Sequence, residues 1–72
     1  MKQISYNPLW KTLIDKGHKK TDLVEIAGIG RATLAKLSKN QEVSMTVLLK
    51  ICKLLDCDIK DIVEIRRNIR ED

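Results

Sequence analysis

Two short amphipathic segments joined at a glycine constrain the fold of this chain more than any other feature. Between residues 19 and 39, apolar side chains recur at helical spacing on both sides of Gly28, namely at Leu23, Ala27, Ile29, Leu34 and Leu37. Glycine readily takes the left-handed backbone conformation that ends a helix, so Gly28 predicts a tight turn. The pattern therefore predicts a helix over about 20–27, a turn, and a second helix that begins after Gly30 and runs to about Ser38, with their apolar faces on one shared core.

The outward side of the second helix is polar and basic, with Arg31, Thr33 and Lys36 expected at its surface. Residues 16–39 hold six basic and two acidic side chains, a net charge of +4, whereas residues 40–64 hold three basic and five acidic ones, a net charge of −2. Such an arrangement attracts a polyanion to one face. A helix pair with this surface is typical of proteins that read duplex DNA. Composition alone leaves open the plainer interpretation that the basic residues only keep the protein soluble.

Length and composition limit the class of protein. A chain of 72 residues forms one domain with one small core, and this core is aliphatic because the chain has no Phe. No apolar run approaches the roughly 20 residues of a membrane-spanning helix, and the N-terminus lacks the apolar segment of a signal peptide. We therefore expect a soluble, cytoplasmic protein. Cys52, Cys57 and the distant His18 do not supply the four ligands of a zinc site, so we expect the cysteines to act as small core side chains and no metal or cofactor to be needed.

Three further helices are predicted around this pair. The first spans about 8–16, with Asn7 as its N-cap and Gly17 as its stop, and its apolar stripe consists of Leu9, Trp10, Leu13 and Ile14. The most apolar helix is expected over 45–55, capped by Ser44, and therefore at the centre of the domain. Asp58 is expected to cap a short fifth helix over 59–64. The predicted architecture is thus an all-α, five-helix domain over 7–64.

The two ends of the chain leave more than one interpretation open. Residues 1–6 are expected to form an extended arm laid against the core. Residues 65–72 form a charged tail that could extend the last helix, add an edge strand or lack regular structure. Ile65 and Ile69 lie four residues apart in this tail, which suits either a dimer contact or a frayed end.

Five short helices with a turn between the second and third resemble the lambda-repressor-like, Cro/C1-type helix-turn-helix domains, in particular their small single-domain bacterial members. The resemblance covers about residues 7–64. It rests on Asn7-Pro8-Leu9-Trp10, on Thr21-Asp22-Leu23 followed by Gly28-Ile29, on Thr33-Leu34-Ala35-Lys36-Leu37, and on segments 47–52 and 55–63.

The resemblance implies a role for individual residues. The third helix would enter the major groove and contact bases through Arg31, Ala32, Thr33 and Lys36. Phosphates would be contacted by Lys19, Lys20, Gly30, Lys39 and Asn40. An arginine can donate two hydrogen bonds to guanine, which fits this role. Two positions depart from the family pattern: Gly30 stands where Ser or Thr is frequent, and Val24 where Ala is common.

The function expected from these features is that of a sequence-specific, double-stranded-DNA-binding transcriptional regulator that occupies an operator. We expect a weak homodimer, formed free or only on DNA, with half-sites about one helical turn apart. No catalytic motif is present in the sequence, and neither an enzymatic activity nor a small-molecule ligand is expected. The alternative is a small protein-interaction module, an adaptor or antitoxin-like partner. Such a module would expose an apolar stripe, for which the sequence offers only Ile65 with Ile69.

Overall fold

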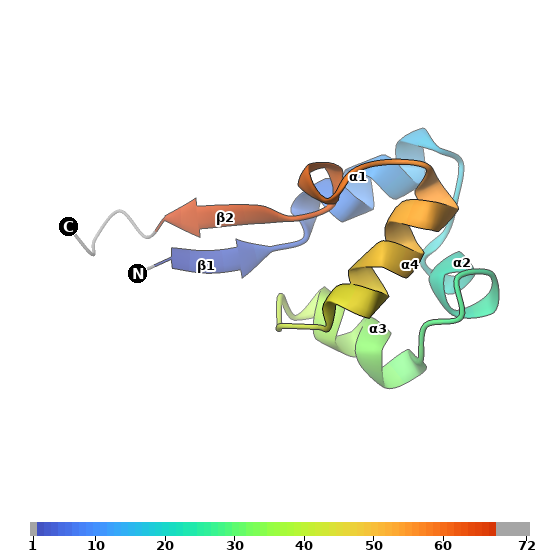
Figure 1. Cartoon of the computed structure of the whole chain (residues 1–72), viewed down its shortest axis with the longest axis horizontal. Helices are drawn as coiled ribbons and strands as arrows, with labels where there is room; N and C mark the ends of the chain where they lie inside the picture. The colour runs from blue at the N-terminus through green and yellow to red at the C-terminus, as the bar shows by residue number, and fades with distance from the viewer. Residues whose placement is uncertain (1, 68–72) are drawn as a thin grey trace.

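The computed structural model describes residues 2–67 and consists of a cluster of helices from which a two-stranded ribbon projects (Figure 1). The elements follow one another as β1 (Lys2–Ser5), α1 (Asn7–Asp15), α2 (Lys20–Glu25), α3 (Arg31–Ser38), α4 (Met45–Leu55), the 3₁₀ turn η1 (Ile59–Asp61) and β2 (Glu64–Arg67). Strands β1 and β2 pair antiparallel, with Ile4 opposite Ile65 and Ser5 opposite Glu64. Lys2 and Arg67, the first and last described residues, therefore lie opposite each other at the same end of the molecule.

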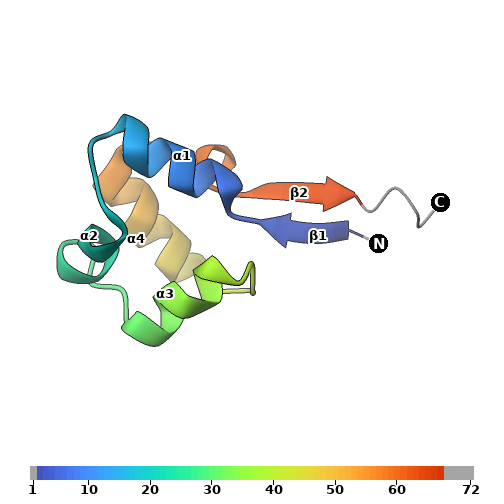
Figure 2. The same ribbon diagram turned by 180° about the vertical axis from the view of Figure 1, so that it is seen from behind.

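The helices form because each buries an apolar side against one common core. Helix α4 supplies three of its buried side chains, Leu48, Ile51 and Leu55, and crosses between α1 and α3 in both views (Figures 1 and 2). The other buried apolar residues come from every remaining part of the helical cluster; they are Tyr6, Leu9, Leu13, Leu23, Ile29, Leu37 and Ile62. The prediction that the helix over 45–55 is central is confirmed. No helix within residues 2–67 is both long and apolar enough to cross a membrane.

The residues predicted to stop α1 and to cap α4 do so in the structure, whereas the predicted N-cap of α1 does not. Gly17 ends α1 at φ +75°, where its N–H donates to the Ile14 carbonyl at 3.0 Å. Ser44 caps α4, because its hydroxyl accepts a hydrogen bond from the Val47 N–H at 3.3 Å. The predicted N-cap at Asn7 is wrong by one residue. Helix α1 begins at Asn7, and the N–H of Asn7 donates instead to the buried hydroxyl of Ser5 at 3.2 Å.

The prediction of an all-α, five-helix domain needs correction at both ends of the chain. Four α-helices are present in the described residues, whereas the expected fifth helix over 59–64 is a single 3₁₀ turn, Ile59–Asp61. The chain then extends, because the run Ile62-Val63-Glu64-Ile65 is rich in β-branched residues and the N-terminal arm offers a strand to pair with. Of the three interpretations of the tail, the strand is the one adopted up to Arg67. Ile69 and the rest of the tail lie outside the described residues.

The side chains of α1 are less uniformly buried than predicted. Leu9 and Leu13 lie in the core, but Ile14 is 75% exposed and Trp10 is only half-buried. Ile14 follows Leu13 directly and is therefore turned about 100° around the helix axis, away from the core. The assignment of Ile14 to the core stripe is thus wrong, and Trp10 lies at the rim of the core.

Alanine at Gly28 is expected to lower the free energy of unfolding by about 1–2 kcal/mol, because Gly28 adopts φ +77° and an L-residue is strained there. Gly30 is the matched control, because it ends the same turn at φ −67° and alanine there should change stability by only a few tenths of a kcal/mol. A Cβ added at either position meets no atom within 4 Å, so steric crowding contributes to neither change in stability. Urea unfolding followed by circular dichroism measures both changes. An equal loss of unfolding free energy in the two variants would contradict the inference that alanine is strained at Gly28.

Candidate nucleic-acid interface

The turn between α2 and α3 is held by backbone geometry and by one apolar side chain. After Gly28, the Ile29 side chain is buried, and the Ile29 N–H donates to the Leu23 carbonyl at 3.0 Å. Gly30 then takes an extended conformation as the N-cap of α3. This sequence of conformations fixes where α3 begins and the direction in which it leaves α2, as a helix-turn-helix requires.

Helix α3 presents one side to the core and the other to solvent. Leu37 is fully buried and Leu34 half-buried, whereas Arg31, Ala32 and Lys36 are exposed. Thr33, the fourth residue predicted to contact bases, is half-buried. Arg31 lies at the N-terminal end of α3 and Lys36 about one and a half turns further along, so the exposed part of the helix carries two positive charges.

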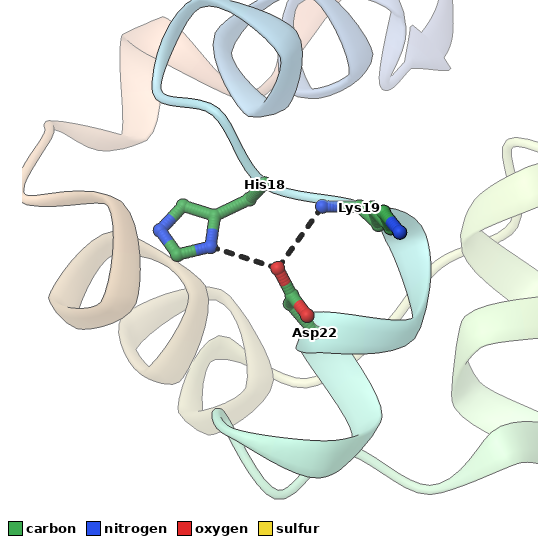
Figure 3. A network of polar contacts seen from close by, with 3 residues as sticks. All are labelled: His18, Lys19 and Asp22. Carbon is green, nitrogen blue, oxygen red and sulfur yellow. Dashed lines mark hydrogen bonds and ion pairs between the residues drawn. The ribbon is translucent and has the colours of Figure 1, made fainter.

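Lys19 and Lys20 lie at the beginning of α2, and Lys19 takes part in a local network of polar contacts. Asp22 accepts a hydrogen bond from the Lys19 N–H at 3.1 Å, and its carboxylate oxygen lies 2.9 Å from His18 Nδ1 (Figure 3). The Lys19 N–H, more than the His18 ring, holds the pKa of the Asp22 carboxyl below its ordinary value. The carboxylate is thus occupied by local donors, while both lysine side chains remain exposed.

Lys20 makes a contact that sequence reasoning missed. Its ammonium nitrogen lies 4.5 Å from the centre of the Trp10 ring, a cation–π contact that joins α2 to α1. Trp10 was predicted to be an ordinary core residue. The ring does pack against the core, at its rim, and it also contacts the side chain of a residue that the family resemblance places against a phosphate.

The far end of α3 is tied to the N-terminal arm. Asn40 takes a left-handed conformation at φ +58°, and its side-chain oxygen accepts a hydrogen bond from the Tyr6 N–H at 3.0 Å. The Tyr6 hydroxyl donates to the Gln41 carbonyl at 2.7 Å. Burial, and secondarily the charge of Glu42, raises the pKa of Tyr6 above its ordinary value, so the hydroxyl remains a donor at neutral pH. Asn40 therefore has a structural role, and only its side-chain NH₂ can donate to a phosphate.

The predicted contact residues fall into two groups along the chain, one in and directly around the ends of α3 and one at the beginning of α2. Gly30, Arg31, Ala32 and Lys36 lie exposed at the turn and along the helix, and Lys39 and Asn40 continue the exposed surface at its end. Lys19 and Lys20 lie at the beginning of α2, which precedes α3 across the turn (Figure 2). Tyr6, which positions residues 40 and 41, was missed. Its signal in the sequence was slight, an aromatic side chain just before the predicted first helix.

The two cysteines lie away from this surface. Both are half-buried and free. Burial, with the neighbouring Cys52 as a further cause, raises the pKa of Cys57 to about 11, and burial also raises the pKa of Cys52. Both thiols therefore stay protonated at neutral pH, where a thiol is a poor nucleophile.

Comparisons with known proteins support a helix-turn-helix domain over most of the chain. The family model of the Cro/C1-type helix-turn-helix DNA-binding domain matches residues 8–67. The crystal structure of the transcriptional regulator VanUg, form II, is similar to this chain with a TM-score of 0.88 and 51% sequence identity, over 93% of this chain and 89% of the other. No curated protein matches the sequence. The resemblance drawn from the motifs is thus confirmed.

Proposed function

This chain belongs to the family of Cro/C1-type helix-turn-helix DNA-binding domains, and from that premise we propose that it is a transcriptional regulator that recognises a specific sequence of duplex DNA. The observation that carries the proposal is the exposed, basic face of α3 beyond a firmly held turn. Helix α3 enters the major groove, and the protein acts by occupying an operator. The similarity to a transcriptional regulator over nearly the whole chain supports this role.

Each part of the interface has its own task in the proposal. Arg31, Ala32, Thr33 and Lys36 contact base edges, which carry the sequence information. Lys19, Lys20, Gly30, Lys39 and Asn40 contact phosphates, which fix the position of the protein without reading sequence. Two copies bind a site with two-fold symmetry, because one helix pair covers too few base pairs for high specificity.

The experiment that tests the function is a fluorescence-anisotropy titration of the duplex upstream of the protein's own gene across a salt series, compared with duplexes of scrambled sequence. The proposal expects much tighter binding to the upstream duplex, with an affinity that falls as salt rises. Equal, weak binding to every duplex would leave only a basic surface and would contradict a sequence reader.

Alanine at Lys20 is expected to weaken binding to all duplexes alike and to reduce the slope of log affinity against log salt by about 1, because one phosphate contact is lost. Lys60 is the matched control, since it is an exposed lysine on η1 rather than on α2 or α3. The intrinsic fluorescence of Trp10, the only tryptophan, should also change when wild-type protein binds DNA, because Lys20 leaves its ring for a phosphate. An unchanged salt slope in the Lys20 variant would remove this contact from the proposal.

A second candidate function is that of a protein-interaction module, and one observation favours it. The sequence offered only Ile65 with Ile69 as an exposed apolar feature, but Ile26 is also largely exposed. Ile26 lines a shallow hollow between α2 and α4 together with Ala27, Leu54 and the basic pair Lys50 and Lys53. An adaptor role would predict loss of a partner, with DNA binding unchanged, when Ile26 is replaced by glutamate.

A further inference from the structure

A shallow hollow between α2 and α4 lies outside the proposed DNA interface. It has a volume of about 430 Å³ and is lined by Ile26, Ala27, Lys50, Lys53 and Leu54. The second half of α4 runs beside α2 in both views, so each helix supplies one wall (Figures 1 and 2). None of the lining residues is among those proposed to contact bases or phosphates. This feature, the α2–α4 hollow, is therefore a surface separate from the one assigned to DNA.

The apolar part of the α2–α4 hollow is more exposed than the fold requires. Ile26 is the C-cap of α2, where its N–H donates to the Asp22 carbonyl at 2.8 Å, yet its side chain is 61% exposed. The turn that follows is anchored in the core by the buried side chain of Ile29. The Ile26 side chain instead adds apolar surface to the hollow beside Ala27 and Leu54. Exposed apolar side chains that gather in a hollow with a polar rim are typical of a site for another protein.

The charged part of the α2–α4 hollow has one sign. Lys50 and Lys53 lie three residues apart on α4, hence on one side of the helix, and both are exposed. Of the three basic side chains in residues 40–64, these two line the hollow, whereas none of the five acidic ones does. Neither lysine forms an ion pair with a carboxylate of residues 2–67. The hollow is thus basic within a part of the chain whose net charge is negative.

The apolar floor and the basic rim together specify what fits the hollow. A phosphate gains from the lysines but not from Ile26, and an uncharged apolar peptide gains nothing from the lysines. A protein segment with carboxylates beside a bulky apolar side chain is complementary to both. Lys50 and Lys53 are separated by about 4.5 Å along the axis of α4, since each residue advances about 1.5 Å. Carboxylates three residues apart on a second helix have the same separation, so a helix lying along α4 can place one against each lysine.

We propose that the α2–α4 hollow binds an acidic amphipathic helix of a partner protein. A bulky apolar side chain of that helix packs against Ile26, Ala27 and Leu54, and two of its carboxylates pair with Lys50 and Lys53. The inference rests on the second candidate function, to which it adds the chemistry of the partner, and not on DNA binding. Because the hollow shares no residue with the proposed DNA interface, the helix binds the free protein and its DNA complex alike.

Selection from a displayed library of helical peptides, with the full chain as the target, tests the proposal. We expect the enriched peptides to carry two acidic residues three or four positions apart, next to Leu, Phe or Trp. In calorimetric titrations, an enriched peptide should bind Lys50→Glu/Lys53→Glu at least roughly tenfold more weakly than wild type, because two attractive pairs become repulsive. The same peptide with its two acidic residues changed to lysine should prefer this double variant over wild type.

Matched variants separate the hollow from general effects of charge and hydrophobicity. Lys11→Glu/Lys60→Glu makes the same change of charge at two exposed lysines outside the hollow and should leave peptide affinity unchanged. Ile26→Ala should weaken binding of the peptide by about tenfold, as expected for an apolar anchor at the centre of an interface. Ile14→Ala is its control, since Ile14 lies on α1 and is 75% exposed, and it should bind the peptide like wild type.

Several outcomes would overturn the proposal. A library that enriches no acidic peptide would do so, as would an enriched peptide that binds Lys50→Glu/Lys53→Glu as tightly as wild type. Enriched peptides that lack acidic residues but depend on Ile26 would refute the acidic partner and leave the interaction module in place.

Two other occupants of the hollow are distinguished with the same double variant, and either result would refute an acidic partner. If a second copy of the chain covers the hollow, the variant changes self-association in sedimentation equilibrium. If Lys50 and Lys53 contact phosphates, the variant loses affinity for every duplex, and the slope of log affinity against log salt falls by about 2. Failure of the wild-type chain to bind any duplex would refute the proposed DNA-binding function and leave the peptide result valid.

Discussion

Replacing Arg31 by alanine is expected to reduce discrimination between the preferred duplex and a duplex with a changed contacted base by about 5- to 160-fold, equivalent to about 1–3 kcal/mol. Arg31 is exposed at the first position of α3, directly after the Gly30 cap, where the proposal places it against a base edge. The loss should fall on the preferred sequence and spare random DNA. Anisotropy titrations of the two duplexes at one fixed salt concentration measure it.

The matched control for Arg31→Ala is Arg31→Lys, which keeps the positive charge but not the two parallel donors of the guanidinium. This variant should retain most of the affinity for random DNA and still lose discrimination. If Arg31→Lys discriminates like wild type, and Arg31→Ala weakens binding to every duplex alike, Arg31 contacts a phosphate and the proposed division between base and phosphate contacts is wrong at this position.

Replacing Leu37 by alanine is expected to lower the free energy of unfolding by about 2–5 kcal/mol, because the side chain is fully buried beneath the exposed face of α3 and its removal leaves a cavity. Small domains have little stability to spare, so a sizeable fraction of this variant should be unfolded at 37 °C. DNA affinity should fall only through the loss of folded protein. Urea unfolding monitored by circular dichroism measures the change.

Leu49→Ala on α4 makes the same chemical change at a position that is 57% exposed, and it should alter stability by no more than about 0.5 kcal/mol. Similar losses in the two variants would contradict the assignment of Leu37 to the core. Excess ligand restores folding by mass action, so an operator duplex should raise the unfolding midpoint of Leu37→Ala. That rise would show that the variant retains the DNA-contacting face of α3.

Much of the helical part of this fold could be predicted because the residues at the helix ends and the spacing of the buried side chains favour the same helices. Gly17 and Gly28 both adopt the positive φ that their places after helical segments suggested. Ser44 accepts the capping hydrogen bond expected of it. The family resemblance then named residues that the structure places at the surface of α3 and at the beginning of α2, a grouping that spacing alone would not provide.

The ribbon and its connections could not be predicted in the same way, because they depend on contacts between distant parts of the chain. Strand β2 forms where Ile65 meets Ile4, and a four-residue strand carries little local signal of its own. The same holds for Tyr6, whose partners Asn40 and Gln41 lie more than thirty residues away. The contact between Lys20 and Trp10 depends on the angle between α1 and α2, which helical periodicity does not specify.

Selection of preferred duplexes from a random-sequence library, followed by titration of the selected duplex against its scrambled counterpart at physiological salt, tests the central claim most directly. The account predicts enrichment of a motif with two-fold symmetry, two half-sites about one helical turn apart, and affinity at least about 1,000-fold above that for scrambled DNA. A library that emerges without an enriched motif, with all duplexes bound equally and with the same salt dependence, would contradict the claim that α3 reads sequence.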